Sequence, residues 1–145
     1  IDGVEKPGNL GAIFRTADAA GIDLIIITAP GTDLYNPNSI RASLGCVFTV
    51  KSIICEPNQA INWLRNNNIA IYCSYLQAAI PYHNIDYTKP SAIVMGTEAT
   101  GLTNNWLNYS DSNIIIPMQG AADSMNVSVA AAVLVFEARR QRGFV

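Results

Sequence analysis

Three short segments rich in glycine, asparagine and serine carry the residues of this 145-residue chain that could do chemistry: residues 9–15, 96–101 and 124–128. The first segment begins with Asn9 and ends with Arg15. A helix start with an arginine nearby can receive a phosphate group, because free backbone N–H groups and a guanidinium both favour anions. By itself, however, this segment is better explained as a capped helix with one exposed arginine.

The second and third segments add a carboxylate and a cluster of small polar groups. Glu98 lies in a turn bounded by two glycines, which allow the backbone to approach a flat ligand closely. The turn lacks the Lys-Ser/Thr pair of a phosphate-binding P-loop, and the chain has no G-x-G-x-x-G motif, so nucleotide-phosphate sites of these kinds are excluded. Ser124 and Asn126 are both good helix caps, which is more than one helix end needs. The third segment therefore favours a functional role slightly.

Four continuous apolar runs, rich in β-branched residues, predict strands covered on both faces. They are residues 24–28, 69–74, 92–96 and 113–117, with 52–55 as a weaker candidate. Helical patterns lie between them, at residues 10–20 (capped by Asn9 and ended by Gly21), 40–44, 57–66, 104–109 and 126–142. The alternation predicts an α/β domain with a mainly parallel sheet flanked by helices. In such sheets ligands bind beyond the carboxyl ends of the strands, where the second and third segments fall.

Composition limits the remaining possibilities. Half of the residues are hydrophobic and 14% are charged, as expected for one folded domain with a real core. The formal net charge of −2 argues against holding nucleic acid by charge alone. The three cysteines form no C-x-x-C pair, so we expect buried thiols in a reducing cytoplasm. The single histidine, His83, cannot build a metal site, and we expect it to lie in a loop. We expect no membrane span and, in the last helix, a largely buried element.

The start of the chain reads as the tail of a strand, since residues 1–4 lead almost directly into the first helix. We therefore expect that an upstream region precedes Ile1 in a longer protein.

Three motifs occur in order along the chain: PGNLGAI with Arg15, GTEATGL, and IPM followed by SMNVS. Together they resemble the SpoU/TrmH family of the SPOUT superfamily, whose members are RNA 2′-O-ribose methyltransferases. The stretch RASLG at residues 41–45 also looks like this family, and the resemblance spans nearly the whole chain. It implies that residues 1–145 form a SPOUT catalytic domain whose C-terminal part is tied into a deep trefoil knot, an exception to the rule that chains are unknotted. It further implies S-adenosylmethionine as cofactor, rRNA or tRNA as substrate, a homodimer with the active site near its interface, no metal, and a cytoplasmic location.

The resemblance also assigns residues. Its catalytic positions are Asn9, Arg15, Glu98, Ser124 and Asn126. Its cofactor-binding positions lie in three loops and are Ser74, Tyr75, Leu76, Met95, Gly96, Glu98, Gly101, Ile116, Met118, Ser124, Met125, Asn126 and Val127. Because a guanidinium hardly deprotonates in proteins, our hypothesis is that Arg15 holds an RNA phosphate and stabilises the developing alkoxide, rather than acting as a simple base. Asn9, Glu98 and Ser124 would orient Arg15 or the ribose, and Asn126 would shape the cofactor loop.

Two alternatives remain open from the sequence. A degenerate SPOUT module could bind S-adenosylmethionine or RNA without turnover, and a base methyltransferase of the same superfamily could modify a different atom. The intact catalytic positions argue against the first, and the combination of Arg15 with Ser124-x-Asn126 argues against the second. Many family members carry an N-terminal RNA-binding domain that is absent here, so we expect RNA selection to lie partly in residues outside this chain. The first motif resembles ribosomal RNA enzymes slightly more than transfer RNA enzymes.

Overall fold

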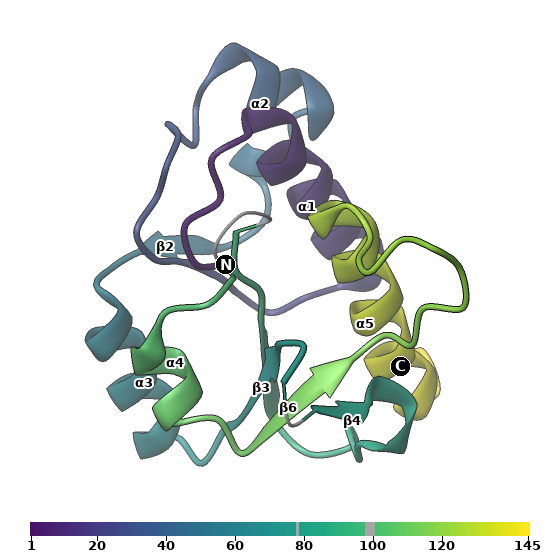
Figure 1. The fold of residues 1–145 in the computed structure, drawn as a ribbon. Helices are drawn as coiled ribbons and strands as arrows, with labels where there is room; N and C mark the ends of the chain where they lie inside the picture. Colours follow the sequence, from purple (N-terminus) through teal and green to yellow (C-terminus); the bar gives the residue numbers. More distant parts are fainter. Residues whose placement is uncertain (78, 98–100) are drawn as a thin grey trace.

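The computed structural model describes residues 1–77, 79–97 and 101–145, and strands alternate with helices along them (Figure 1). The α-helices in these residues are α1 (Pro7–Ala20), α2 (Pro37–Ala42), α3 (Pro57–Asn66), α4 (Asn104–Asn108) and α5 (Val127–Gln141). The strands are β1 (Ile25–Ile27), β2 (Ser52–Ile54), β3 (Ala70–Ser74), β4 (Ala79–Pro81), β5 (Ser91–Val94) and β6 (Ser112–Ile115). Two short 3₁₀ helices are η1 (Cys46–Phe48) and η2 (Tyr82–Asn84), so His83 lies in a helical turn and not in the predicted loop.

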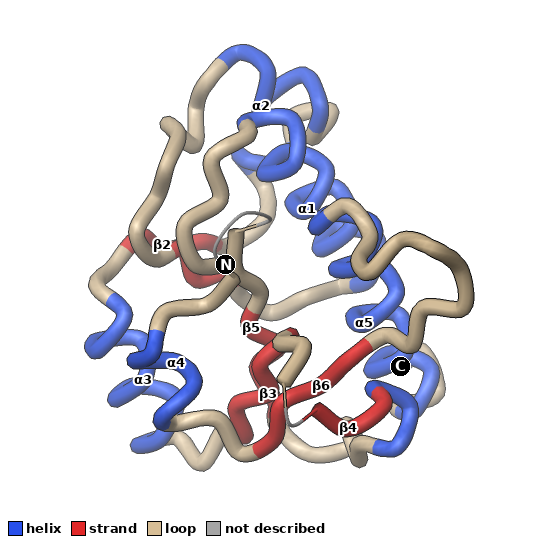
Figure 2. Tube along the Cα trace, viewed as in Figure 1, coloured by secondary structure: helices blue, strands red, loops and turns tan. Residues whose placement is uncertain are grey.

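The strands pair in parallel, as the apolar runs predict, but they form two sheets. The smaller sheet pairs β1 with β2, and the larger has the order β4-β6-β3-β5. Helices α3 and α4 lie on one side of the larger sheet and α1 and α5 on the other, with the strands between them (Figure 2). Strand β4 was not predicted, because three residues ending in a proline give little strand signal. Its place at the sheet edge suits Pro81, which cannot donate to a ladder.

Residues 1–4 connect the two sheets, in agreement with the strand tail expected there. The backbone N–H of Asp2 donates to the carbonyl of Met95 at 2.8 Å, and the N–H of Gly3 donates to the carbonyl of Thr28 at 2.9 Å. The buried Asp2 carboxylate accepts from the Thr28 hydroxyl at 2.7 Å and from the Thr103 hydroxyl at 3.3 Å. This short segment therefore fixes the ends of β1 and β5 relative to each other.

Proline decides where two helices begin, and both starts differ from the prediction. Helix α1 begins at Pro7, with Lys6 as its N-cap, so Asn9 lies in the first turn and is not the cap. Helix α2 begins at Pro37 instead of residue 40, with the side chain of Asn36 accepting from the N–H of Asn38. Proline at the first helical position supplies the helical φ in advance and loses no hydrogen bond, so it outweighs later capping residues.

Helix α5 is buried on one face only, which corrects the expectation of a largely buried helix. The inward face carries Val127, Ala131, Leu134 and Ala138 and packs against α1 and the larger sheet. On the outward face, Val129 is 50% exposed and Phe136 is 39% exposed. These two side chains are seven residues apart and lie on the same side of the helix, so α5 presents an apolar stripe outward.

The cysteines and the charged residues give no sign of a metal or disulfide framework in the described part of the chain. All three cysteines are free, but only Cys73 is buried; Cys46 and Cys55 are half-buried, contrary to the prediction of buried thiols. Among residues 1–77, 79–97 and 101–145, no three histidine, cysteine or acidic side chains gather as a metal site would require. No helix within the same residues is long and apolar enough to cross a membrane.

Candidate active site

A cavity of about 380 Å³ lies where β3, β5 and β6 end. Its walls are residues 74–77 from the end of β3, residues 95–97 and Gly101 after β5, residues 114–116 and Met118 at the end of β6, and residues that lead into and begin α5. The parallel register places these three carboxyl ends at one edge of the sheet, which is where α/β sheets bind ligands. The volume is in the range of pockets that hold small molecules.

Eleven of the thirteen predicted cofactor-binding residues line this cavity. They are Ser74, Tyr75, Leu76, Met95, Gly96, Gly101, Ile116, Met118, Ser124, Met125 and Val127. Glu98 lies outside the described residues, and Asn126 lies next to the wall without forming part of it. The cavity also has lining residues that the sequence did not single out: Gln77, Thr97, Ile114, Ile115, Asp123 and Ala130. Of these, Asp123 carried a signal that could have been read, since it is an acidic residue directly before the third polar segment.

Gly96 occupies a position that no larger residue could take. A Cβ atom on Gly96 would lie 2.3 Å from the carbonyl oxygen of Gly101, closer than non-bonded atoms approach. Two backbone hydrogen bonds join Thr97 and Gly101, at 3.2 and 3.1 Å, and Gly101 has a φ of +70°. Both glycines are therefore required by the backbone itself. Both glycines line the cavity, where their backbones approach each other closely.

Asn126 joins the first polar segment to the third. Its amide Nδ2 donates to Oδ1 of Asn9 at 3.0 Å, across 117 positions of sequence. Its own Oδ1 accepts from the backbone N–H of Ser128 at 2.9 Å and from the Ser128 hydroxyl at 2.6 Å, which makes Asn126 the N-cap of α5. Ser124 is not a second cap, because its hydroxyl donates to Oδ1 of Asp123 at 3.1 Å. One asparagine thus serves both the helix end and the contact between segments.

Arg15 lies apart from this cluster in the single chain. It is exposed on α1, it is not part of the cavity wall, and within the described residues its guanidinium forms no hydrogen bond or ion pair. Arg15 is six residues after Asn9, so the two side chains leave the helix in different directions. Of the predicted catalytic residues, the structure therefore brings Asn9 and Asn126 into contact, places Ser124 in the cavity wall, and leaves Arg15 outside it.

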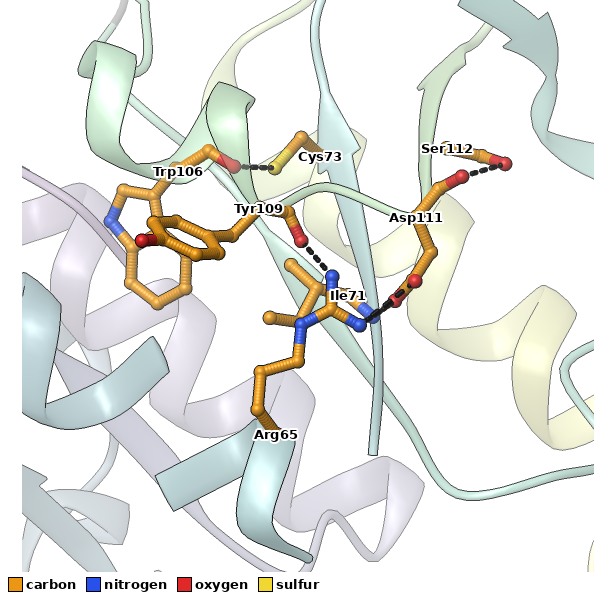
Figure 3. A network of polar contacts seen from close by, with 7 residues as sticks. All are labelled: Arg65, Ile71, Cys73, Trp106, Tyr109, Asp111 and Ser112. Carbon is orange, nitrogen blue, oxygen red and sulfur yellow. Dashed lines mark hydrogen bonds and ion pairs between the residues drawn. The ribbon is translucent and has the colours of Figure 1, made fainter. Parts of the chain in front are cut away.

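A network of polar contacts at the amino ends of the strands, opposite the cavity, holds the strands that carry the site (Figure 3). Arg65, at the end of α3, pairs with the carboxylate of Asp111 at 2.9 Å and also donates to the carbonyl of Tyr109. The same carboxylate accepts from the backbone N–H of Ile71 at 2.7 Å. Although burial works in the opposite direction, these hydrogen bonds and the Arg65 charge lower the pKa of Asp111. Asp111 therefore fixes the amino ends of β3 and β6 while their carboxyl ends form the cavity.

Comparisons with known proteins show which family the chain is similar to. Residues 1–136 match the model of the SpoU rRNA Methylase family. The chain is 34% identical over 139 residues to the 23S rRNA (guanosine(2553)-2′-O)-methyltransferase of Bacillus subtilis, covering 96% of this chain and 56% of that protein. It is 38% identical over 143 residues to the tRNA (guanosine(18)-2′-O)-methyltransferase of Escherichia coli, covering 98% of this chain and 62% of that protein. The chain thus spans little more than half the length of these relatives.

The solved structures give the same result for the fold. The crystal structure of an AdoMet-bound rRNA methyltransferase from Sinorhizobium meliloti superposes with a TM-score of 0.92 at 37% identity, covering 96% of this chain and 54% of that one. The predicted fold class, an α/β domain of parallel strands and flanking helices with the knotted SPOUT topology, is therefore confirmed. With the family model matching most of its length, the chain belongs to the SpoU rRNA methylase family.

Proposed function

We propose that this chain is the catalytic domain of an enzyme that transfers a methyl group from S-adenosylmethionine to a ribose 2′-hydroxyl in rRNA or tRNA. The observation that carries the proposal is the cavity at the ends of β3, β5 and β6, which is lined by the second and third polar segments of the sequence. The family membership and the 2′-O-methyltransferase activities of the two relatives support the same reaction.

The cavity wall suits S-adenosylmethionine chemically. The apolar side chains of Met95, Ile116 and Met118, with the backbone of Gly96, offer surface on which an adenine ring can pack. The Asp123 carboxylate lines the same cavity and can attract a cationic ligand. When bound, S-adenosylmethionine supplies an activated methyl group on a positively charged sulfur. The protein's task is then to place the ribose hydroxyl in line and to help it lose its proton.

We assign these tasks to the first and third segments. Asn126, held by the cap of α5 and by Asn9, shapes the loop beside the cavity. Arg15 holds a phosphate of the RNA and stabilises negative charge that develops on the ribose oxygen, and Ser124 and Glu98 orient the ribose. An exposed Arg15 outside the cavity wall fits an active site that a second copy completes. We therefore propose a homodimer, and the outward stripe of α5 at Val129 and Phe136 supplies an apolar surface for it.

We also propose where the reaction takes place and which part of the protein selects the RNA. We place the activity in the cytoplasm, which fits the three free cysteines. Since the chain covers only part of its relatives, we assign part of the RNA selection to segments outside residues 1–145.

The proposal is tested by measuring S-adenosylmethionine affinity beside methyl transfer to total RNA from cells that lack the gene. Digestion of the product should yield nuclease-resistant dinucleotides, because a 2′-O-methyl group blocks cleavage of the adjacent phosphodiester. Binding without transfer to any RNA would instead indicate a cofactor-binding module, and nuclease-sensitive product would indicate methylation of a base. Arg15→Lys should reduce transfer strongly, because lysine lacks the planar fork that grips a phosphate; near-normal turnover would contradict the role given to the guanidinium.

A further inference from the structure

Two stacked aromatic rings are exposed on the segment that contains α2 and η1, and an exposed leucine lies near one of them in the sequence. Tyr35 and Phe48 stack with ring centroids 5.7 Å apart and planes 12° from parallel. Tyr35 is 56% exposed, Phe48 is 64% exposed, and Leu44, close to Phe48 in the chain, is 70% exposed. We call these three side chains the aromatic platform. Adjacent apolar side chains that remain exposed on a folded domain mark a surface for interaction.

The platform is held firmly on α1, near the first polar segment. Helix α2 packs so closely on α1 that a Cβ atom on Gly11 would lie 2.4 Å from the carbonyl oxygen of Ser39. The Ser39 hydroxyl also donates to the carbonyl of Pro7 at 3.1 Å. Leu44 has a φ of +52°, a conformation that residues other than glycine rarely adopt, and this backbone leaves its side chain exposed. The platform is thus attached to the helix that carries Asn9.

The charges around the platform favour nucleic acid. Residues 34–55 contain Arg41 and Lys51 and no acidic residue, although the whole chain has a net charge of −2. Both basic side chains are exposed. Arg15, also exposed, follows Gly11 by one turn on α1 and so lies on the side of that helix that faces α2. The stretch is bounded by two exposed acidic residues, Asp33 and Glu56, and the Asp33 carboxylate accepts from the backbone N–H of Tyr35 at 2.9 Å. Exposed rings together with Arg15, Arg41 and Lys51 match the bases and phosphates of a single strand of RNA.

We propose that the aromatic platform stacks nucleobases of single-stranded RNA substrate while Arg41 and Arg15 contact its phosphates. This inference rests on the proposed function, since it names the part of the surface that receives the RNA. It assigns unpaired RNA as the substrate form, because stacking needs the face of a base and duplex bases are already stacked.

The test measures binding of a fluorescein-labelled single-stranded RNA of mixed sequence by anisotropy at several salt concentrations. Phe48→Ala should weaken binding about fivefold or more, because an aromatic ring under one base contributes that much, and should leave the salt dependence unchanged. Arg41→Gln should lower the slope of log affinity against log salt by about 0.7, as expected for the loss of one phosphate contact on a single strand. Phe48→Tyr, which keeps a ring, should bind like the unaltered chain. Tyr109→Ala is the matched control, since Tyr109 is 50% exposed but lies beside α4.

Separate readings distinguish failure of this inference from failure of the proposed function. All these variants should bind S-adenosylmethionine normally, because none of the altered residues lines the cavity. Equal RNA affinity for Phe48→Ala and Tyr109→Ala would overturn the inference, as would absence of RNA binding by the unaltered chain or equal losses on duplex RNA. An altered oligomeric state of Phe48→Ala with unchanged RNA affinity would overturn it in favour of a protein contact. If Phe48→Ala binds RNA as well as the unaltered chain does and methyl transfer is intact, only this inference is contradicted. If the unaltered chain binds RNA but transfers no methyl group, only the enzymatic proposal is contradicted.

Discussion

Replacing Asn126 with serine separates its capping of α5 from its contact with Asn9. Serine caps a helix about as well as asparagine, so Asn126→Ser should keep the cap of α5. The shorter hydroxyl, which already serves the cap, should lose the 3.0 Å contact with Asn9. Asn126→Ala removes both. If the contact between the first and third segments positions the site, Asn126→Ser should lose activity with little loss of stability.

The expected magnitudes follow from the two contacts. Loss of the cap in Asn126→Ala costs about 1 kcal/mol of unfolding free energy, which for a chain of this size lowers the melting temperature by about 3 °C. The contact with Asn9 is one exposed hydrogen bond worth about 1 kcal/mol or less, so its loss should reduce methyl transfer about fivefold when it acts on positioning alone. Asn126→Ser should therefore melt within about 1 °C of the unaltered chain.

The assay compares thermal melting with methyl-transfer rates for Asn126→Ser, Asn126→Ala and Asn9→Ala. Asn9→Ala and Asn126→Ser should both lose activity, and combining them should cost less than the sum of the two losses, because both remove the same hydrogen bond. Asn36→Ala is the control for capping, since Asn36 caps α2 with the same geometry but lies outside the cavity; it should lower stability without changing cofactor affinity. Full activity in Asn126→Ser, or additive losses in the double variant, would refute the positioning role of the contact.

Three further predictions use glycine positions and one titrating group. Gly96→Ala should reduce S-adenosylmethionine affinity at least tenfold in calorimetry, because its Cβ would meet backbone at 2.3 Å, whereas Gly120→Ala, which has open space around it, should bind normally; equal affinities would show that the turn can open. Gly11→Ala should lose about 1–3 kcal/mol in denaturant unfolding by pushing α2 away, while Gly8→Ala on the same helix meets nothing and should be neutral or slightly stabilising; matching losses would contradict the close packing. Hydrogen bonds from neighbouring α5 side chains lower the pKa of Glu137 to about 2, against the effect of burial. Its stabilising effect should be complete above its unfolded-state pKa and should disappear as the pH falls towards 2, so the melting temperatures of the unaltered chain and Glu137→Gln should converge in acid; a constant difference would contradict the shifted pKa.

The strands were predictable because burial on both faces leaves a continuous apolar signal, and each long run became a strand within one or two residues of its expected ends. Helix starts were less predictable. Asn9 and Asn36 are equally good caps in isolation, but proline placed both helix starts, so only Asn36 serves as one. Strand β4 gave no usable signal, because its existence depends on the neighbouring edge of β6 and not on its own residues.

The sequence by itself determined the α/β class, the family and most of the residues that line the cavity, because these depend on local patterns and on motif order. Only the tertiary structure showed that Asn126 caps α5 and contacts Asn9 at once, and that Arg15 lies outside the cavity wall of its own chain. The same is true of the exposed stack of Tyr35 on Phe48. Each of these depends on side-chain direction and on segments far apart in the chain, which spacing along a sequence does not encode. The three polar segments were visible from the start, but folding decided which of their members meet.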